Sequence, residues 1–394
     1  MRLPLLPRRY TRHGTALVCT LLIALLLWAN PSVTPVGKPL WAPWFGEPLA
    51  PTSRDTHPPP LPRTLTLHLV PHSHSDIGWN LSFQGYYNAT VRSVLRRVTR
   101  SLLRSPVRRF TWGDLAFLDM WMAEEGDALV EGEGNVTWRG ALARLAEERR
   151  MDVVGGTYVS PDEGLSTWWA LNSLADVGRR THHRLLRQPT SVGWQIDPFG
   201  HFARLPRLLA NSGFTHLVLG RMSHDTLYAL RMRHALQFLW QAKDTGGGGA
   251  AHHPLLTHFL STHYAFPAKE LDFDHTESCD VPRLLRVLRR YALQQVRQYP
   301  GHGHVLVMLG DDFRYVAAER AFACIDRLVA HQGLPGITLR YSTPSEYFAS
   351  VEPHLLDPAQ PLYRLKGDLY PYQDKPYEQY WAGILASRMR LKRA

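Results

Sequence analysis

Short apolar runs alternate with longer amphipathic stretches over residues 64–341. The stretch 91–104 shows the helical pattern most clearly, because its apolar positions recur every three or four residues and share one face. All of these stretches except 114–122 are followed by a short run that is typical of a buried strand. The predicted strands are 64–70, 109–112, 151–155, 191–195, 216–219, 305–309 and 337–341, and the predicted helices are 91–104, 114–122, 139–150, 168–187, 205–212, 281–299 and 318–331.

This alternation predicts an α/β fold built on a parallel sheet. In such folds, functional groups gather at the carboxyl ends of the strands, so chemistry is expected in the segments that follow them. The glycine run at 246–249 predicts a flexible loop. It lacks the lysine and the strand–helix setting of a phosphate-binding loop.

The first predicted strand leads into the segment PHSHSDIGW at 71–79. His74 and Asp76 are two positions apart on extended chain, so their side chains face the same side. Imidazole nitrogens and carboxylate oxygens are ligands that zinc takes in proteins. A polar turn with capping histidines fits the same segment, and the motif alone leaves both interpretations open.

Two further clusters follow predicted strands. Asp197 lies in GWQIDPFGH, where a carboxylate at the end of a buried strand is costly unless it is paired or bound to a metal. Asp311 and Asp312 are adjacent, and the proximity of like charges raises one pKa, which lets one group act as a general acid. Each of these aspartates could instead start a turn or cap a helix.

Taken together, PHSHSDIGW, WQIDPFGH and GDDFRY resemble glycoside hydrolase family 38, the class II α-mannosidases. Weaker matches occur at FTWGDLAFL, VVGGTYVSPDE and LVLGRMSHD. The resemblance runs from about residue 64 to the end of the chain. It implies a (β/α)7 barrel-like catalytic domain over residues 64–394, and a zinc-dependent retaining α-mannosidase that trims N-glycans.

The resemblance also implies roles in metal binding, catalysis or substrate binding for five side chains. His74, Asp76 and Asp197 would be zinc ligands. Asp197 would also be the nucleophile that forms a covalent mannosyl ester. Asp312 would be the general acid/base, with Asp311 as its neighbour.

Three more side chains would contact the sugar or lie close to the nucleophile. Trp79 would line the sugar site, although it could instead pack in the core. Arg221 would lie near Asp197, although it could be a plain surface or core-edge arginine, and Tyr264 would contact the substrate. The chain departs from the family pattern at Ala265, where Golgi-type enzymes carry aspartate, and at Asp114, where glutamate is usual.

The family's fourth zinc ligand is a histidine of a histidine–aspartate–glycine motif, in a helical region that lies further along. The resemblance implies that this region and the β-domains after it are absent from the 394 residues, so the chain alone is expected to be weakly active or inactive. Two alternatives stay open. One is a truncated mannose-binding fragment, and the other is a zinc-dependent carbohydrate deacetylase.

The first 63 residues differ in character from the rest of the chain. Residues 1–14 are basic, 15–29 are apolar and 30–63 are rich in proline. This order predicts a cytosolic tail, a membrane anchor and a luminal stem, and therefore a single-pass type II protein of the Golgi membrane. A cleaved signal peptide is the alternative for 15–29, and a lysosomal or secreted protein is the alternative destination.

The amino-acid composition adds little to this functional interpretation. The net charge of +11 could suggest a nucleic-acid partner, but no zinc-finger or RNA-recognition signature accompanies it, so a solvated basic surface is expected. Cys279 and Cys324 could pair, although two cysteines make no framework. The pattern does not indicate an oligomeric state. Three N-x-[ST] triplets, typical of N-glycosylation sites, begin at Asn80, Asn88 and Asn135.

Overall fold

The computed structural model describes residues 62–242, 253–331, 334–356 and 361–388. The predicted tail and anchor, nearly all of the stem and the glycine run 246–249 lie outside the described residues. Among the residues that the structure describes, none of the helices combines the length and the hydropathy of a membrane span.

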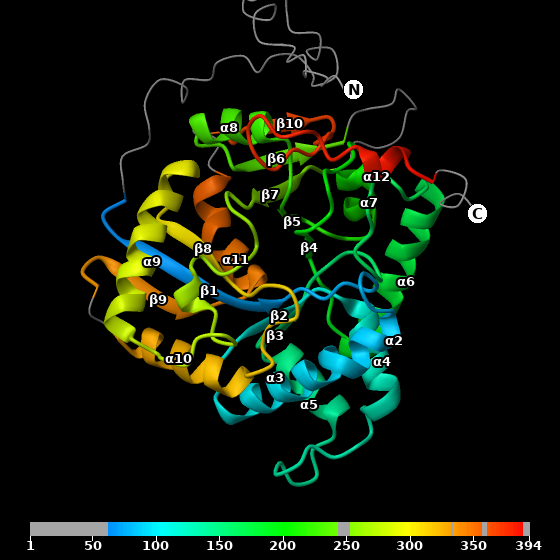
Figure 1. Ribbon diagram of the computed structural model, residues 1–394, viewed down its shortest axis with the longest axis vertical. Coiled ribbons are helices and arrows are strands. Elements are labelled where there is room, and N and C mark those ends of the chain that lie inside the picture. Colours follow the sequence, from blue (N-terminus) through cyan, green and yellow to red (C-terminus); the bar gives the residue numbers. More distant parts are fainter. Residues whose placement is uncertain (1–61, 243–252, 332–333, 357–360, 389–394) are drawn as a thin grey trace, which may run out of the picture. The chain divides into compact units, whose positions relative to one another are not determined.

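Two five-stranded sheets carry the fold (Figure 1). The first is built around β1 (Leu65–Ser73), the longest strand, which is buried along nearly its whole length. All of its strands run parallel. β8 (His304–Leu309) pairs with β1, β9 (Ile337–Tyr341) flanks the first half of β1, β2 (Phe110–Trp112) pairs with its last two residues, and β3 (Met151–Val153) follows β2.

The second sheet has the order β10-β6-β7-β5-β4. Among the described strands of this sheet, only the β6–β7 pair is antiparallel. The bounds are Val192–Gln195 for β4, His216–Leu219 for β5, Gln237–Gln241 for β6, Leu255–Phe259 for β7 and Arg364–Lys366 for β10.

A single parallel bridge between Gly155 and Gly193 connects the two sheets where β3 and β4 meet. Seven parallel strands therefore follow one another in the order β8-β1-β2-β3-β4-β5-β7. Within the described residues, no strand pairing joins β7 to β8. The predicted α/β fold with parallel strands is confirmed, and the arrangement follows the strand order of a barrel without complete pairing around it.

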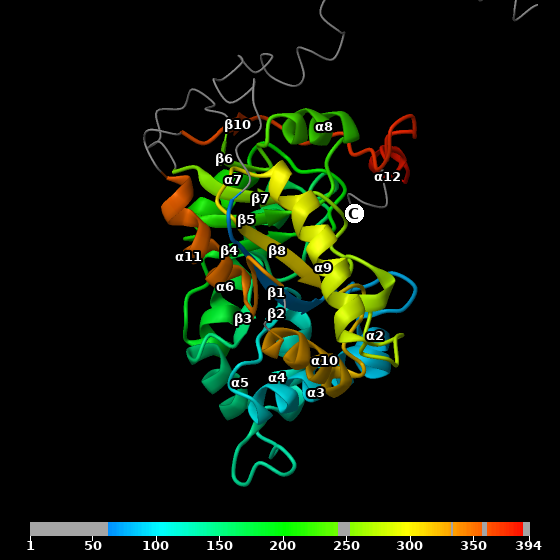
Figure 2. The same ribbon diagram turned by 90° about the vertical axis from the view of Figure 1, so that its left-hand side faces the viewer.

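The predicted helices are also confirmed, with ends that shift by a few residues. The apolar face of 91–104 is buried in the core next to β1, and α3 packs against α5 and α10 (Figure 2). The helices are α2 (Phe83–Tyr86), a π-helical turn (Tyr87–Val91), α3 (Arg92–Arg104), α4 (Leu115–Glu125), α5 (Trp138–Glu147), α6 (Trp168–Leu186), α7 (Leu205–Asn211), α8 (His224–Met232), α9 (Val281–Gln295), α10 (Ala318–Ala330), α11 (Pro344–Leu355) and α12 (Gly383–Ala386), with 3-10 turns at Lys269–Leu271 and Val296–Gln298.

A disulfide joins Cys279 to Cys324, with their Cα atoms 5.7 Å apart. It ties the segment before α9 to α10. The open question of whether these cysteines pair is thereby answered in favour of a disulfide. Cross-links of this kind persist in oxidising compartments and are rare in the cytosol.

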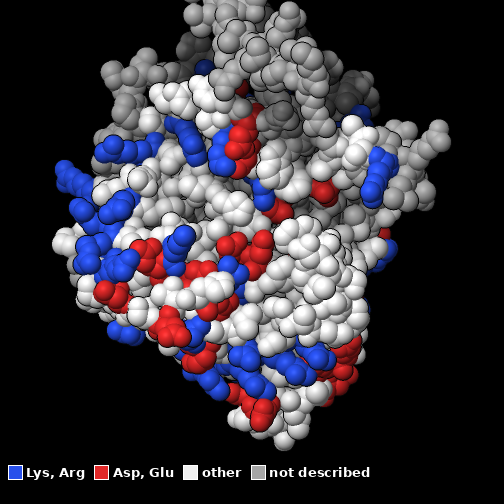
Figure 3. Space-filling view, in the orientation of Figure 1, with Lys and Arg blue, Asp and Glu red and all other residues white. Residues whose placement is uncertain are grey.

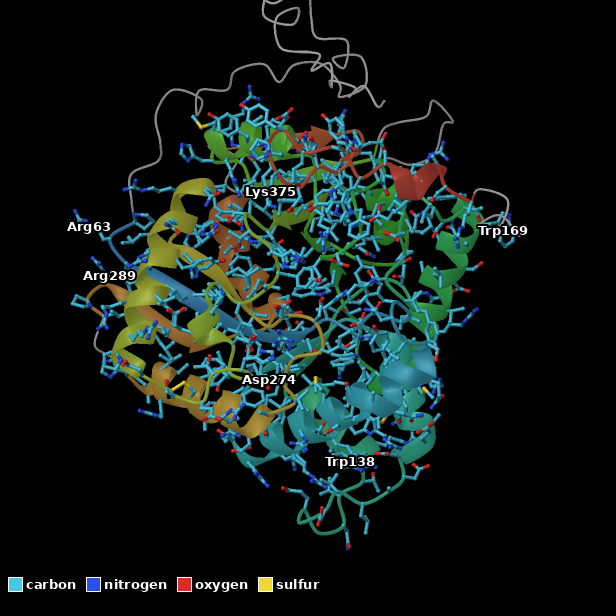
Figure 4. The ribbon with its side chains drawn as sticks, in the orientation of Figure 1. Arg63, Trp138, Trp169, Asp274, Arg289 and Lys375 are labelled. Atoms are coloured by element: carbon cyan, nitrogen blue, oxygen red, sulfur yellow. A yellow bond between two sulfur atoms is a disulfide. The ribbon has the colours of Figure 1, made fainter. Side chains whose placement is uncertain are left out.

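Basic side chains gather on the solvent side of α9, at the left of the face shown in Figure 3. Arg283 pairs with Glu270 at 2.7 Å. Arg289 points outward from the helix in Figure 4. The helix therefore follows the amphipathic pattern, with arginines exposed to solvent and leucines in the core.

Four histidines lie close together in the interior between the two sheets and α11; we call them the interior histidine cluster: His68, His258, His302 and His304. His68 shares hydrogen bonds of 2.9 Å with His304 and with the hydroxyl of Ser342. His258 lies 3.1 Å from the hydroxyl of Tyr347, and His302 lies 2.6 Å from the amide oxygen of Gln237. Burial lowers the pKa of His68, His258 and His302 to about 3, and neighbouring positive groups add to the effect.

Candidate active site

The ends of β1 and β8 meet at the centre of the site. The backbone N–H of His74 donates to the carbonyl of Asp311 at 3.2 Å, and Phe313 donates to the carbonyl of His74 at 2.8 Å. Gly310 makes this approach possible, because a Cβ at that position would lie 2.1 Å from the carbonyl oxygen of His72. Backbone pairing therefore places His74 next to Asp312.

His74, Asp76 and Asp197 converge on one point although they come from different sheets. Nε2 of His74 lies 3.6 Å from Oδ1 of Asp76 and 3.6 Å from Oδ2 of Asp197. One potential ligand atom from each residue lies within 4.8 Å of the others. The structure therefore brings together the three side chains that the resemblance assigned to zinc.

The surroundings of His74 fit a metal ion. Its Nε2 atom is buried and has no hydrogen-bond partner, because 3.6 Å is too long for a hydrogen bond to either carboxylate. One imidazole nitrogen and two carboxylate oxygens form a donor set that zinc accepts. Burial works to lower the pKa of His74, but the carboxylates of Asp197 and Asp76 outweigh it and raise that pKa well above its usual value. The site therefore attracts positive charge.

Asp197 is held by an arginine on the opposite side from His74. Arg221 donates from Nε to Oδ1 of Asp197 at 2.8 Å, and its Nη2 donates to the same oxygen. Burial works to raise the pKa of Asp197, but His74 and Arg221 lower it to about 2. The carboxylate is therefore ionised at neutral pH, as a nucleophile must be.

Arg221 is enclosed by aromatic rings and is not an ordinary surface arginine. Its guanidinium carbon lies 4.8 Å from the ring centre of Phe199, 5.6 Å from that of Tyr372 and 5.8 Å from that of Trp381. The hydroxyl of Tyr372 also accepts from Arg221 at 3.2 Å. These contacts fix the direction in which the guanidinium points.

Asp312 has a different environment from Asp197. Its Oδ1 accepts a hydrogen bond of 2.8 Å from the hydroxyl of Tyr264, whose side chain is only 2% exposed. Burial raises the pKa of Asp312, and the charges of Asp311 and Asp197 add to this, while Tyr264 and His74 oppose it. Two carboxylates whose pKa values are moved in opposite directions are a feature of acid/base catalysis.

Asp311 and Trp79, the other two residues that were predicted to belong to the site, differ in their contacts and exposure. Asp311 accepts from the backbone N–H of Asp312 at 2.9 Å, so its side chain shapes the turn. The side chain of Trp79 is 71% exposed, so the alternative of core packing is wrong. No contact in the structure assigns Trp79 to a sugar, and that role stays a prediction.

Several residues at the site had no predicted role. Asp114 is buried and accepts from the N–H of Ser75 at 2.9 Å, which fixes the loop after β1, and burial raises its pKa to about 6. His263 lies 3.3 Å from Nη2 of Arg221. Phe199, Tyr372 and Trp381 carry no recognisable metal or acid/base pattern, and only their place around Arg221 reveals them.

Comparison with known proteins agrees with this geometry. The model of the family described as "Glycosyl hydrolases family 38 N-terminal domain" matches residues 64–375. The chain is 30% identical over 365 residues to lysosomal alpha-mannosidase of Mus musculus, covering 86% of this chain and 34% of that protein. It is 29% identical over 339 residues to alpha-mannosidase F of Dictyostelium discoideum, covering 83% and 33% respectively.

Among solved structures, the chain is similar in fold to an alpha-mannosidase from Enterococcus faecalis V583. The TM-score is 0.58 at 17% identity, covering 77% of this chain and 31% of that one. The chain spans about a third of the length of the curated relatives it matches.

Proposed function

This chain belongs to glycosyl hydrolase family 38, and on that premise we propose that it is a zinc-dependent retaining α-mannosidase that removes α-linked mannose from N-glycans. The observation that carries the proposal is the convergence of His74, Asp76 and Asp197 from two sheets, with Asp312 held beside His74. A family of mannosidases and a partly buried donor set for a divalent cation support the same reaction.

Asp197 is the proposed nucleophile. Its carboxylate attacks the anomeric carbon and forms a mannosyl ester, while the bond to the leaving oxygen breaks. Its low pKa keeps it ionised for the attack, and Arg221 holds one of its oxygens in place. A carboxylate fixed in this way needs little reorganisation before it reacts.

Asp312 is the proposed general acid and base. In its protonated form it gives a proton to the leaving oxygen, and it then takes a proton from the water that hydrolyses the ester. Burial favours the protonated form that the first step requires. A zinc ion held by His74, Asp76 and Asp197 would supply Lewis-acid stabilisation of the bound sugar.

Turnover of an aryl α-mannoside by the purified chain, with zinc and with a chelator, tests the proposal. Zinc-dependent release of the aryl group supports it. Binding of mannose without release would point instead to a mannose-binding fragment, and release of acetate from an acetylated glycan would point to a deacetylase. The deacetylase is not favoured, because the chain matches the mannosidase family.

Replacing Tyr264 with phenylalanine is expected to shift the alkaline limb of the kcat/KM profile to higher pH. The Tyr264 hydroxyl stabilises ionised Asp312 and so lowers its pKa. Without the hydroxyl the pKa of Asp312 rises, and the protonated acid persists to higher pH. The pH profile of kcat/KM measures the shift. A limb that stays in place, or moves to lower pH, would contradict the assignment of Asp312.

We propose the Golgi membrane as the location, with the catalytic domain in the lumen; a lysosomal or secreted form is the alternative. The order of basic, apolar and proline-rich segments in residues 1–63 supports an anchored protein. The Cys279–Cys324 disulfide supports a secretory compartment. Buried histidines with a lowered pKa destabilise a folded protein at acidic pH. The interior histidine cluster therefore favours a near-neutral compartment over a lysosome.

Expression in a secretory cell line is expected to give N-glycosylation of Asn135. This asparagine is exposed in the loop between α4 and α5. Asn88 is less suitable, because it lies in helical chain and its side chain accepts from Gln84 at 3.3 Å. Digestion with an N-glycosidase measures the mass shift. Asn135→Gln should remove that shift and Thr137→Ser should keep it. As a control for entry into the lumen, a second N-x-[ST] triplet is added at the C-terminus.

If this added triplet is glycosylated and Asn135 is not, the expectation is wrong.

A further inference from the structure

A hydrogen-bonded pair, Glu163 and His201, lies buried behind the site and makes no contact with the predicted ligands. The side chains of His201 and Glu163 are both fully buried, and Nδ1 of His201 lies 2.8 Å from Oε1 of Glu163. The other carboxylate oxygen of Glu163 accepts from the backbone N–H of Phe202 at 3.0 Å. Burying two polar side chains is costly unless their hydrogen bonds are satisfied, so the partners of this pair call for an explanation.

The hydrogen bonds fix the protons on this pair. Nε2 of His201 lies 2.6 Å from the carbonyl oxygen of Gly220, which can only accept, so Nε2 must carry a hydrogen and donate. A second proton must then lie between Nδ1 and Oε1, because two bare acceptors would repel each other at 2.8 Å. His201 therefore donates towards Gly220 on one side and is held by Glu163 on the other.

The carbonyl that His201 binds belongs to the peptide bond that leads into Arg221. Arg221 has φ = +53°, a left-handed conformation that is unfavourable for a residue with a Cβ. Gly220 packs so closely that a Cβ there would lie 2.1 Å from the carbonyl oxygen of Ile196, the residue before Asp197. The plane of the 220–221 peptide sets φ of Arg221, and it is fixed by His201 on one side and by packing on the other.

We propose that the Glu163–His201 pair is a positioning device that holds the Gly220–Arg221 peptide so that the Arg221 side chain reaches Asp197. If the carbonyl of Gly220 lost its donor, the peptide plane could rotate and relieve the positive φ. The guanidinium would then move away from Oδ1 of Asp197. The pair thus acts through Arg221 and does not touch the substrate.

The proposal rests on the function proposed above for Asp197, but its geometric core can be tested without turnover. The hydrogen bond from Nε–H of Arg221 to Asp197 can be followed by NMR with ¹⁵N-labelled arginine. The signal is assigned by its loss in Arg221→Lys. Its rate of hydrogen exchange reports how often the bond opens.

His201→Leu removes the donor and keeps a buried apolar side chain. His182→Leu is the matched control, because His182 is also buried and contacts a backbone carbonyl, that of Val153 at 3.0 Å, away from Arg221. We expect His201→Leu to speed exchange of the Arg221 Nε–H by about tenfold or more, while His182→Leu leaves it unchanged. His201→Gln should restore part of the protection, because its amide N–H can donate to Gly220.

Turnover of an aryl α-mannoside supplies the second measurement. His201→Leu is expected to lower kcat by about tenfold, the loss typical of a residue that orients another, while KM changes little. If His201→Leu does not fold, Glu163→Gln provides the same test, because it keeps the size of the side chain and weakens its hold on the ring.

The outcomes separate the two proposals. Unchanged Arg221 exchange in His201→Leu overturns the positioning role even if the enzyme is active. An equal change in His182→Leu also overturns it, because general destabilisation would then explain the effect. Absence of turnover in the unsubstituted chain favours the mannose-binding fragment over the mannosidase, and the exchange measurement still decides the role of His201.

Discussion

Replacing Asp197 with asparagine is expected to lower zinc-dependent turnover of an aryl α-mannoside by about 10³-fold or more, the scale seen when a nucleophile is removed. The amide cannot form the mannosyl ester. The change also removes a negative charge from the point where His74, Asp76 and Asp197 converge, so the affinity for zinc should fall as well. Initial rates and zinc titration against a chelating dye measure the two effects.

Asp176→Asn is the matched control, because Asp176 lies on the surface of α6 and pairs only with neighbouring arginines of that helix. It should keep both turnover and zinc affinity. If Asp197→Asn kept more than about a tenth of the parent rate, Asp197 could not be the nucleophile. Loss of zinc affinity with full turnover would separate the metal from the reaction.

Acidification from pH 7 to pH 5 is expected to lower the free energy of unfolding by about 4 kcal/mol through His68 and His258 alone, or about 2 kcal/mol for each ring. Both rings have a pKa of about 3 in the folded protein, against 6.5 for an ordinary histidine. Between these values the unfolded chain binds more protons than the folded one. The contribution of these two rings to stability is therefore full above about pH 6.5, and it is lost as the pH drops towards 3.

The groups around these rings do not offset this loss of stability, because they are hydroxyls, an amide, other histidines and Arg340. Urea unfolding at pH 7, 6 and 5 measures the slope. His258→Phe keeps the stacking on Tyr299, whose ring centre lies 4.6 Å away, and should reduce the loss by about 2 kcal/mol. Substitution of His183, which is exposed, should leave the slope unchanged. Equal slopes in the parent and His258→Phe would refute the cluster as the cause.

Much of the first sheet and its helices could be predicted from the sequence, because the pattern of apolar and polar residues that identifies each element lies within the element itself. The α3 pattern and the strand β1 combine clear periodicity with a core on one face. The structure also has β6 and β7, which no prediction included. They pair across the interval 242–254, and that pairing depends on contacts distant in sequence. α11 was missed although Thr343 and Glu346 form a capping box with Pro344 at the first helical position, a signal that the sequence does contain.

The candidate site could likewise be predicted only in part from the sequence. His74, Asp76 and Asp197 stand out in short motifs, because each motif places polar groups directly after an apolar strand. The enclosure of Arg221 does not, because Phe199, Tyr372 and Trp381 come from separate segments and carry no charge. The buried Glu163–His201 pair lies within two matched motifs, but only the folded chain shows that it binds the carbonyl of Gly220.

The pairing of β1 has a consequence for the nascent chain. Its partners β8 and β9 are translated about 240 and 270 residues later than β1 itself. A ribosome that adds about 5–20 residues per second leaves this apolar strand without those neighbours for tens of seconds. During that interval the strand is a target for chaperones and for aggregation, and a truncation that removed β9 would leave the first half of β1 permanently unpaired on one edge.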